Sequence, residues 1–479
     1  MRRTKIVATL GPATEDPKML DRIIEAGVDV VRINFSHGSP EEHKERVERV
    51  RNRARAHGRQ VGVLVDLQGP KIRIDRFENG SVMLEEGQTF VLDIKHDPKA
   101  GNKQRVSCTY KQLPDDVKRG DTLLLDDGRI TLWVDEVAGH EVICRVTSGG
   151  ELSDRKGINR LGGGLSAPAL TEKDRADIKT AAEMKADYLA VSFPRSAEDI
   201  HRARRLLEEA GGRAGIVAKI ERAEAVTCID DIISASDAIM IARGDLGVEI
   251  GDAALPPVQK RLCTLARSRN RVVIIATQMM ESMIDNQIPT RAEVFDVANA
   301  VLDGTDAVML SAETAVGKYP DKAIAAMDRV CREAEKSPQA RVSTHRIEEQ
   351  FERTDEAIAM AAMYTANHLN VKAIGALTES GSTPLWMSRI SSDIPIYALT
   401  RQVETRRKVT LYRGVQPVSF NVVTKDHAEV NREVVDELLR RGAVRDGDLV
   451  IITKGDLAGV LGGTNAMKIV KVGELVSVD

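Results

Sequence analysis

Short runs of apolar, β-branched residues recur eight times between residues 5 and 310, and amphipathic stretches fill most of the gaps between them. The runs are apolar almost throughout instead of alternating with polar residues, which is typical of strands buried on both faces of a parallel sheet. Eight such units match a (β/α)8 barrel, whereas an open doubly wound sheet usually has fewer. The runs are Lys5–Leu10, Val28–Phe35, Val61–Leu67, Tyr188–Phe193, Gly215–Ile220, Ala238–Ala242, Val272–Ala276 and Ala307–Leu310.

Two parts of the chain depart from this pattern. Residues 71–168 hold short strand-like segments separated by Asn79-Gly80, Glu86-Gly87 and Asp127-Gly128, which are turn signals between β-strands. They predict a small β-barrel inserted at the carboxyl end of the third strand, where it would cover the active site as a lid. Beyond residue 342, further apolar runs alternate with helical segments and predict an open α/β sheet.

We therefore expect an α/β protein of three domains. The catalytic (β/α)8 barrel takes residues 1–70 and 169–341, the inserted lid takes 71–168, and a C-terminal α/β domain takes 342–479. The predicted strands outside the barrel are Ser81–Leu84, Thr89–Asp93, Thr122–Leu125, Ile130–Val134, Glu141–Thr147, Val371–Leu377, Ile394–Leu399, Gly414–Val418 and Leu449–Thr453.

Composition excludes several classes of protein. With 69 Lys and Arg against 72 Asp and Glu, the chain does not bind nucleic acid through bulk charge, and 3% aromatic residues do not supply base-stacking platforms. No apolar run approaches the roughly 20 residues that span a bilayer, so we expect a cytoplasmic protein without a membrane partner. The five scattered cysteines show no CxxC spacing, which argues against a disulfide framework or a zinc site.

Polar residues follow the apolar runs at their carboxyl ends, where barrel enzymes place their catalytic groups. For any one of these residues, a structural ion pair is as good an explanation as a functional role. Six charged residues of this set would converge on one mouth of the barrel, and that convergence favours function: Arg32, Asp66, Arg73, Lys219, Glu221 and Asp245. The other residues at the strand ends are Asn34, Ser36, Gly244, Thr277, Ser311 and Glu313.

The residue types in this set indicate a particular chemistry. Carboxylates such as Glu221 and Asp245 suit a hard divalent ion, and Lys and Arg hold phosphoryl oxygens. Gly244 and Asp245 should begin a short helix whose free N–H groups suit an anion. This combination predicts metal-assisted phosphoryl transfer involving a small anionic molecule. The sequence has no GxxxxGK[ST] loop, no kinase-type Gly-rich loop and no dinucleotide fingerprint. The Gly162-Gly163-Gly164 run is better explained as a hinge beside the lid than as a phosphate loop.

Longer motifs resemble the pyruvate kinase family, in the family's order and over essentially the whole chain. They are Thr4–Pro12, Asn34–Gly38, Asp66–Arg73, Lys219–Glu221, Ala242–Glu249, Ala276–Met279 and Ser311–Ala315. The resemblance implies transfer of the phosphoryl group of phosphoenolpyruvate to ADP, giving pyruvate and ATP in the last step of glycolysis. It also implies a homotetramer, and Mg²⁺ or Mn²⁺ bound by Glu221 and Asp245.

The resemblance also implies roles for individual residues. Lys219 neutralises charge on the transferring phosphoryl group and the emerging enolate, while Arg32 and Arg73 hold phosphate. Thr277 and the amides of Gly244 and Asp245 position the substrate carboxylate. Ser311 and Glu313, together with Thr277, belong to the region where the enolate gains its proton. The nucleotide-side positions are Arg32, Asn34, His37 and Lys179.

Two other functions remain open at this point. A barrel enzyme that handles a metal-bound enolate, such as a pyruvate-dependent aldolase, would share the metal ligands but would have no use for Arg32, Arg73 and a large lid. A metabolite sensor on the same fold would have no need to keep four residues together: Lys219, Glu221, Asp245 and Thr277.

One departure from the family pattern bears on monovalent cations. Many members hold K⁺ through groups that match Asn34, Ser36, Asp66 and the carbonyl of Leu67, and they have Glu after the Gly-Pro pair. This chain has Lys71 there. Because an ammonium group can replace the charge of K⁺, we predict activity without K⁺. The alternative is that Lys71 is only a solvated surface charge.

The segment Thr378-Glu379-Ser380-Gly381-Ser382-Thr383 follows a predicted strand and precedes a predicted helix. Its hydroxyl and N–H groups predict an anion site. The alternative is an ordinary Ser/Thr helix cap, but a cap needs one such residue and this segment has four. In the family, the matching loop grips the phosphate of an allosteric activator. The facing segment 454–459 has one cation, Lys454, and Arg432 is the only other candidate, so we predict activation by a sugar monophosphate or AMP instead of a bisphosphate.

Overall fold

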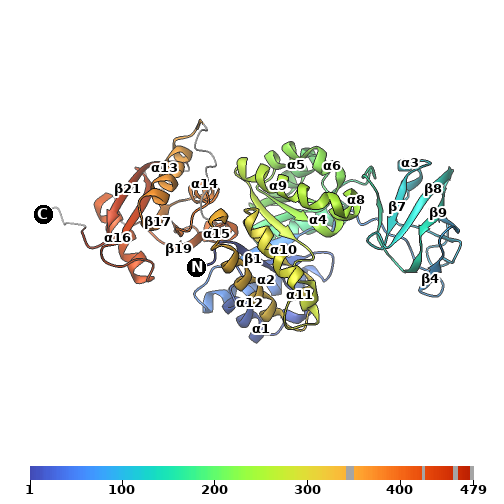
Figure 1. Ribbon diagram of the computed structural model, residues 1–479, viewed down its shortest axis with the longest axis horizontal. Helices are drawn as coiled ribbons and strands as arrows, with labels where there is room; N and C mark the ends of the chain where they lie inside the picture. The colour runs from blue at the N-terminus through green and yellow to red at the C-terminus, as the bar shows by residue number, and fades with distance from the viewer. Residues whose placement is uncertain (341–349, 423–426, 457–461, 475–479) are drawn as a thin grey trace.

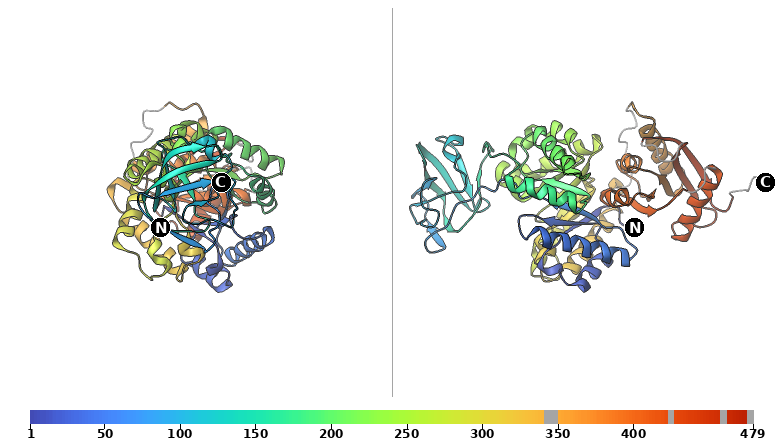
Figure 2. Two further views of the ribbon diagram at one scale, coloured as in Figure 1. Left: turned by 90° about the vertical axis from the view of Figure 1, so that its right-hand side faces the viewer. Right: turned by 180° about the vertical axis from the view of Figure 1, so that it is seen from behind.

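The computed structural model describes residues 1–340, 350–422, 427–456 and 462–474. Three bodies lie in a row, with a barrel of strands and helices in the middle, a β-rich body at one end and an α/β body at the other (Figures 1 and 2). Within the described residues, no helix combines the length and the apolar character needed to cross a membrane.

The eight predicted barrel strands are confirmed. They are all parallel and close into a ring in the order β1-β16-β15-β14-β13-β12-β3-β2. Because β3 pairs directly with β12, the ring closes without the residues between them. The strands are β1 (Lys5–Thr9), β2 (Val30–Asn34), β3 (Gly62–Asp66), β12 (Tyr188–Val191), β13 (Gly215–Ile220), β14 (Ala238–Ala242), β15 (Val272–Ala276) and β16 (Ala307–Leu310).

Helices surround the ring and begin at capping residues that the sequence supplies. The Ser39 hydroxyl accepts the N–H of Glu42 and the Glu42 carboxylate accepts the N–H of Ser39, which starts α2 with a capping box. Thr171 and Asp174 do the same at α4. The barrel helices are α1 (Pro17–Glu25), α2 (Pro40–Ala56), α4 (Glu172–Glu183), α5 (Ala197–Glu209), α6 (Ala223–Thr227), α7 (Ile229–Ala235), α8 (Arg243–Ile250), α9 (Leu255–Ser268), α10 (Arg291–Leu302), α11 (Ala312–Ala315) and α12 (Pro320–Ala334).

Alternate residues of each strand face opposite sides of the barrel wall. Val30, Leu64 and Val217 belong to the core inside the ring, whereas their neighbours Val31 and Val63 pack under the helices. The polar residues at the strand ends continue the inward series, so they project into the carboxyl-end mouth. The three inward series are Val30, Arg32, Asn34; Leu64, Asp66; and Val217, Lys219, Glu221.

The inserted segment forms β structure with its own apolar core, as predicted. Six strands make one sheet in the order β11-β7-β8-β9-β5-β6, and β10 pairs with β4. Three of these strands, β6, β10 and β11, were not predicted because they are short and carry little apolar pattern. The elements are β4 (Ser81–Leu84), β5 (Thr89–Asp93), β6 (Arg105–Val106), α3 (Leu113–Asp116), β7 (Thr122–Leu125), β8 (Ile130–Ala138), β9 (Glu141–Ser148), β10 (Gly150–Ser153) and β11 (Ile158–Arg160).

The C-terminal part is a five-stranded sheet in the order β19-β18-β17-β20-β21, with the four predicted strands parallel. The unpredicted β21 runs antiparallel along one edge and is half polar. The expected boundary at 341/342 lies outside the described residues. The elements are α13 (Thr354–His368), β17 (Val371–Leu377), α14 (Ser382–Ser388), β18 (Ile396–Thr400), α15 (Val403–Lys408), β19 (Val415–Ser419), α16 (His427–Arg440), β20 (Leu449–Gly455) and β21 (Thr464–Lys471).

The C-terminal and inserted bodies contact opposite ends of the barrel (Figure 1). The Tyr188 hydroxyl, at the amino end of β12, donates to the carbonyl of Lys408 at 2.7 Å. The Lys5 ammonium group, on β1, donates to the carbonyl of Val415 at 2.6 Å. The C-terminal body therefore closes the amino-end mouth and leaves the carboxyl-end mouth to the inserted domain.

Candidate active site

A cavity of about 130 Å³ occupies the carboxyl-end mouth of the barrel. Its lining comes from six of the barrel strands and the turns that follow them, so distant parts of the sequence meet there. Eleven predicted site residues line this cavity: Arg32, Asn34, Ser36, Asp66, Leu67, Lys71, Lys219, Glu221, Asp245, Thr277 and Ser311.

Asp66 is the buried centre of this group, with 1% of its surface exposed. Its carboxylate accepts from the Arg32 Nε at 2.6 Å and lies 3.2 Å from the Lys219 Nζ. Burial acts to raise the pKa of Asp66, but the charges of Lys219 and Arg32 outweigh it, so the pKa lies below its usual value. Asp66 is therefore an ionised anchor that holds two cations at the mouth.

Lys219 has three partners. Its Nζ donates to the Ser192 hydroxyl at 2.7 Å and lies 2.9 Å from Glu221 and 3.2 Å from Asp66. Burial acts to lower the pKa of Lys219, but the two carboxylates raise it to about 12. The lysine is therefore a fixed positive charge that lines the cavity.

Glu221 and Asp245 bring two carboxylates to the same cavity. Burial raises the pKa of both groups, although Lys219 acts in the opposite direction. The Glu221 carboxylate forms an ion pair with Lys219 and accepts a hydrogen bond from the N–H of Phe193 at 2.8 Å. Asp245 forms no hydrogen bond or ion pair with any described residue.

This donor set fits a divalent ion such as Mg²⁺. Mg²⁺ is commonly held by one or two carboxylates, with substrate oxygens and water completing the shell. Two neighbouring carboxylates whose ionised forms are disfavoured by burial gain most from an added positive charge. The unengaged carboxylate of Asp245 is the group best placed to supply a ligand.

Thr277 stands in a strained turn after β15. Its φ is 67° and that of Gln278 is 55°, a region that non-glycine residues rarely adopt. The Arg243 Nη2 donates to the Thr277 carbonyl at 2.7 Å, and its Nη1 pairs with Asp296 at 2.7 Å. The Thr277 hydroxyl accepts the N–H of Gly244 at 2.8 Å and donates to the carbonyl of Ala276 at 2.6 Å. These contacts hold the threonine at the start of α8.

Ser311 and Glu313 lie on the far side of the cavity. Ser311 lines it, and its buried Oγ has no hydrogen-bond partner in the described part of the chain. Glu313 does not line it; its carboxylate accepts the N–H groups of Ser311 at 2.6 Å and Met280 at 3.1 Å. Burial raises the pKa of Glu313. The structure thus gives Glu313 the position of a support for the Ser311 backbone.

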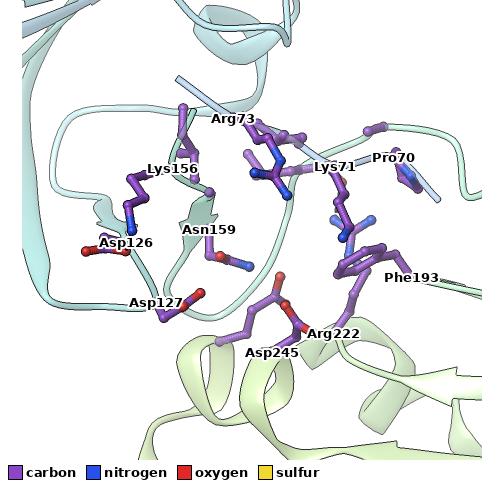
Figure 3. Close-up of a pocket in the computed structure, with 16 residues that line it drawn as sticks. Pro70, Lys71, Arg73, Asp126, Asp127, Lys156, Asn159, Phe193, Arg222 and Asp245 are labelled. Atoms are coloured by element: carbon purple, nitrogen blue, oxygen red, sulfur yellow. Dashed lines mark hydrogen bonds and ion pairs between the residues drawn. The ribbon is translucent and has the colours of Figure 1, made fainter. Parts of the chain in front are cut away.

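A wider cleft of about 330 Å³ continues from this cavity toward the inserted domain (Figure 3). Lys71 and Arg73 reach into it from the segment that enters the inserted domain, and Asp245 faces them from the barrel. Burial of its ammonium group, followed by the charges of Arg73 and Lys219, lowers the pKa of Lys71. The lysine is therefore beside the acidic cavity and not on a remote surface, although it retains solvent exposure.

Comparisons with known proteins decide the family. The pyruvate kinase barrel-domain model matches residues 1–324, and the pyruvate kinase alpha/beta-domain model matches residues 356–470. The chain belongs to the pyruvate kinase family. It is 58% identical to pyruvate kinase II of Salmonella typhimurium over 476 residues, which are 98% of this chain and 99% of that protein.

More distant relatives cover the same span. Identity is 56% over 476 residues with pyruvate kinase of Buchnera aphidicola, again 98% of this chain and 99% of the relative. It is 43% over 475 residues with pyruvate kinase of Mycobacterium tuberculosis, covering 99% of both chains. Membership of the pyruvate kinase family makes this chain a phosphotransferase and implies dependence on Mg²⁺.

Two residues that the family resemblance places on the nucleotide side lie outside both cavities. His37 is exposed in the loop after β2, and Lys179 is exposed on α4, seven residues beyond the first residue of that helix. Seven residues of helix are about 10 Å, so Lys179 lies two turns from the mouth. Lys173, near the start of α4, instead donates to the carbonyl of Phe35 at 2.7 Å.

The sequence analysis missed several residues at the site. Ser192 and Phe193 follow β12 and line the cavity, just as the predicted residues follow other strands. The sequence does carry a signal for Ser192, because Ala190 and Ser192 have the parity of an inward series. Asp127, Lys156 and Asn159 line the cleft from the inserted domain, where the barrel rule does not apply.

The predicted effector loop is an internally bonded turn before α14. Gly381 has a φ of 86° and donates its N–H to the Thr378 hydroxyl at 2.9 Å. The hydroxyls of Ser380 and Ser382 lie 2.8 Å apart, and that of Thr383 lies 3.0 Å from the Thr464 hydroxyl. Glu379 accepts from the Gln402 side chain at 3.0 Å. The facing segment is described at Lys454 and Asp456, while 457–459 lie outside the described residues.

Proposed function

We propose that the chain transfers the phosphoryl group of phosphoenolpyruvate to ADP and forms pyruvate and ATP. The observation that supports this most strongly is one barrel-mouth cavity lined by Arg32, Lys219, Glu221, Asp245 and Thr277. It combines fixed cations for a phosphorylated substrate with carboxylates for a divalent ion, which is what phosphoryl transfer needs.

Lys219 and Arg32 neutralise the charge that moves during transfer. Both are fixed by Asp66, so their charges are aimed at the cavity before substrate arrives. Such preorganised charge is usually the largest single contribution to catalysis in a site that excludes water. Arg73, on the cleft wall near Lys71, adds a further cation for the phosphate.

Glu221 and Asp245 would hold Mg²⁺, with Mn²⁺ as an alternative. When bound, the ion would supply positive charge that stabilises the transferring phosphoryl group. The chain's own contribution is to keep two carboxylates beside Lys219, so that substrate oxygens meet cations on both sides. Thr277 and the Asp245 amide at the start of α8 orient the substrate carboxylate, while the Gly244 N–H holds the Thr277 hydroxyl in place.

The proton that converts the enolate to pyruvate reaches its carbon from the side of Thr277 and Ser311, through water. The unpartnered buried hydroxyl of Ser311 supports this, because such a group is suited to hold a water molecule. Glu313 then acts as a positioning residue that holds the Ser311 N–H.

ADP enters along the cleft between the barrel mouth and the inserted domain. Asn34 lines the inner cavity, and His37 lies three residues further along the same loop, so the two suit the nucleotide side. Lys179 belongs to the same set only if a long side chain on α4 reaches the nucleotide's outer phosphate. Closure of the inserted domain over the cleft would exclude water during transfer.

We also propose that Lys71 replaces K⁺ beside Asn34, Ser36, Asp66 and the Leu67 carbonyl. All five groups line one cavity. For regulation, we propose that the loop 378–383 binds the phosphate of a sugar monophosphate or AMP. The dense set of hydroxyls at this turn supports an anion site.

We propose a cytoplasmic homotetramer built from three domains: residues 1–70 with 169–341, residues 71–168, and residues 342–479. Self-association is supported by exposed apolar side chains on and beside α10: Phe295 is 76% exposed and Ile288 is 74% exposed. Exposed apolar side chains that form one contiguous patch commonly mark a protein interface.

The assay that tests the reaction couples pyruvate formation to a detector enzyme, with phosphoenolpyruvate, ADP and Mg²⁺ as reactants. Pyruvate formed only in the presence of ADP supports the proposal. Pyruvate released from a longer oxo-acid without ADP would instead indicate an aldolase. Binding of phosphoenolpyruvate without turnover would indicate a metabolite sensor.

A further inference from the structure

The junction between the barrel and the C-terminal domain buries an unusual number of arginines. Two come from the barrel side of the chain and two from the C-terminal domain, and they meet at the amino-end mouth. Arg3, Arg389 and Arg413 are 8%, 1% and 8% exposed, and Arg267, on α9, is half-buried. The cluster lies away from the proposed active site, at the opposite end of the barrel.

Carboxylates neutralise only half of this cluster. The Asp306 carboxylate accepts hydrogen bonds from both Nη atoms of Arg389. Glu335 lies 3.6 Å from the Arg3 Nε and also accepts the backbone N–H of Arg3. Among the described residues, no carboxylate forms an ion pair with the guanidinium of Arg267 or Arg413. Asp306 accepts only the backbone N–H of Arg413, at 3.1 Å. One buried and one half-buried positive charge are therefore left without an ion-pair partner.

The two remaining arginines are also poorly satisfied as donors. Arg267 Nη2 donates to the Arg389 carbonyl at 3.1 Å and to the Ser391 hydroxyl at 3.3 Å. Arg413 Nη1 has only two long contacts, of 3.3 Å each, with the carbonyls of Val301 and Thr305. Arg413 Nη2 is buried without any hydrogen-bond partner in the described part of the chain. A buried donor without a partner is destabilising, and a charged one more so.

These arginines line a common cavity of about 20 Å³. That is room for one body the size of a water molecule or slightly larger. Arg3, Arg267 and Arg413 contribute to the lining, with the hydroxyl-bearing residues Ser391 and Ser392 beside them. The remaining wall is mostly apolar and contains Ile390, Ile394, Ile396 and Met363.

We infer that this cavity binds one small monovalent anion of the halide class, held by Arg267 and Arg413 between the barrel and the C-terminal domain. A water molecule could accept from the unpartnered Nη2, but it would leave both charges in a low-dielectric wall. A halide ion in this cavity would accept a hydrogen bond from Arg413 Nη2 and would also neutralise part of the positive charge of Arg267 and Arg413. Burial lowers the pKa of Arg413 to about 10, so this guanidinium is still cationic at neutral pH.

The anion would join two parts of the chain that are far apart in sequence. Arg267 belongs to the barrel, whereas Ser391 and Arg413 precede strands β18 and β19 of the C-terminal sheet. Occupancy therefore favours the docked arrangement of the two bodies, and the effect should be specific to the anion and not to ionic strength.

Bromide tests the site directly in the full-length wild-type protein. Crystals grown with sodium bromide at roughly 0.2 M, enough to screen surface charge, should show an anomalous peak between Arg267 and Arg413. In solution, the midpoint of thermal unfolding should be higher in sodium chloride than in sodium gluconate at equal ionic strength. It should rise by roughly 1–3 °C for each tenfold increase in chloride above its dissociation constant.

Variants separate this site from general salt effects. Arg413→Gln and, independently, Arg267→Gln should abolish both the bromide peak and the difference between chloride and gluconate. The matched control is Arg269→Gln, an exposed arginine at the end of the same helix that pairs with Asp230 at 2.8 Å, and it should leave both unchanged. If Arg413→Gln does not fold, Arg267→Gln and the wild-type bromide data still decide. An ordinary water in the cavity, or a chloride effect that survives in both variants, would overturn the inference.

Discussion

The Lys219 ammonium group donates to the hydroxyl of Ser192 at 2.7 Å, and that hydroxyl donates in turn to the carbonyl of Leu67, also at 2.7 Å. Ser192 therefore ties the central cation of the barrel mouth to the turn after β3. Neither residue lies near the other in sequence. The contact exists because β12 lies between β3 and β13 in the ring.

Ser192→Ala should lower kcat by roughly tenfold, about 1.4 kcal/mol of transition-state stabilisation, since Lys219 keeps its carboxylates but loses the contact that fixes its direction. The measurement is kcat and KM for phosphoenolpyruvate in the coupled assay. Ser236→Ala is the matched control, because Ser236 is equally buried but contacts only carbonyls of α7. Equal kinetics in both variants would contradict a positioning role for Ser192.

Lys219→Met should reduce the rate by roughly 10²–10⁴ with the fold intact, because the change removes a charge at the reacting centre and keeps the length of the side chain. Lys5→Met is the control: Lys5 is also buried, but it lies at the other end of the barrel beside Val415. Near-normal turnover in a folded Lys219→Met protein would remove Lys219 from the mechanism.

Activity should not require K⁺. In tetramethylammonium buffer free of Na⁺ and K⁺, adding K⁺ should change the wild-type rate by less than about tenfold, or 1.4 kcal/mol. Lys71→Glu should create a clear K⁺ dependence, because it removes the ammonium charge beside Asp66. Lys156→Glu controls for a charge reversal elsewhere in the cleft, at a lysine paired with Asp126 at 2.7 Å. A strong K⁺ requirement in the wild-type protein would show that Lys71 does not replace the ion.

Sugar phosphates distinguish the effector site. At sub-saturating phosphoenolpyruvate, ribose 5-phosphate, glucose 6-phosphate or AMP should activate more than fructose 1,6-bisphosphate. Ser382→Asp should abolish that activation, because its carboxylate repels a bound phosphate. Asn370→Asp adds the same charge elsewhere in the domain and should have no effect. Activation by the bisphosphate alone would overturn the choice of ligand, and activation that persists in Ser382→Asp would overturn the choice of loop.

Asp187 predicts a pH dependence of stability. Its carboxylate is buried, accepts the N–H of Val63 at 2.8 Å and lies 3.9 Å from Arg407, and burial raises its pKa to about 6. The unfolded value is about 3.9, so between pH 4 and 6 the folded chain binds more protons than the unfolded chain. The contribution of Asp187 to the free energy of unfolding is therefore largest below pH 4, and it is lost as the pH rises through 6.

The comparison is between wild type and Asp187→Asn. Between pH 4 and pH 7, the free energy of unfolding of the wild-type protein should fall relative to that of the variant. The expected fall is up to about 3 kcal/mol. Asp135→Asn, at a half-buried carboxylate of the inserted domain that pairs with Arg145 at 2.5 Å, should show no such trend. A constant difference between wild type and Asp187→Asn across this range would mean that the pKa of Asp187 is not raised.

The barrel strands and most of the site could be predicted from sequence for a physical reason. Strands buried on both faces are continuously apolar, and the parity of residues along them carries over to the polar ends, so Asp66 and Lys219 were found together. Ser192 obeys the same rule, because it follows Ala190 in the inward series of β12. In contrast, β6 and β10 are formed by tertiary pairing of short segments without a pattern of their own.

The limits of sequence reasoning are also clear at Glu313 and Lys179. Glu313 is two residues from Ser311 in the chain and Lys179 matches a family position, but neither fact says where the side chain lies. Glu313 turns back onto the N–H of Ser311, and Lys179 lies two turns along α4 from the mouth. The arginine cluster at the barrel's amino end could not be predicted either, because it requires the C-terminal domain to dock on that mouth.

The direct pairing of β3 with β12 has a consequence for the order of folding. Leu64 and Asp66 of β3 must meet Tyr188 and Ala190 of β12 across the whole inserted domain. Closing a flexible loop of that length loses chain entropy, but the loss shrinks if the loop has already become compact and brings its ends together. The inserted domain has its own apolar core. Its early folding would therefore shorten the search that completes the barrel, and mutations in that core should slow barrel assembly without touching a barrel residue.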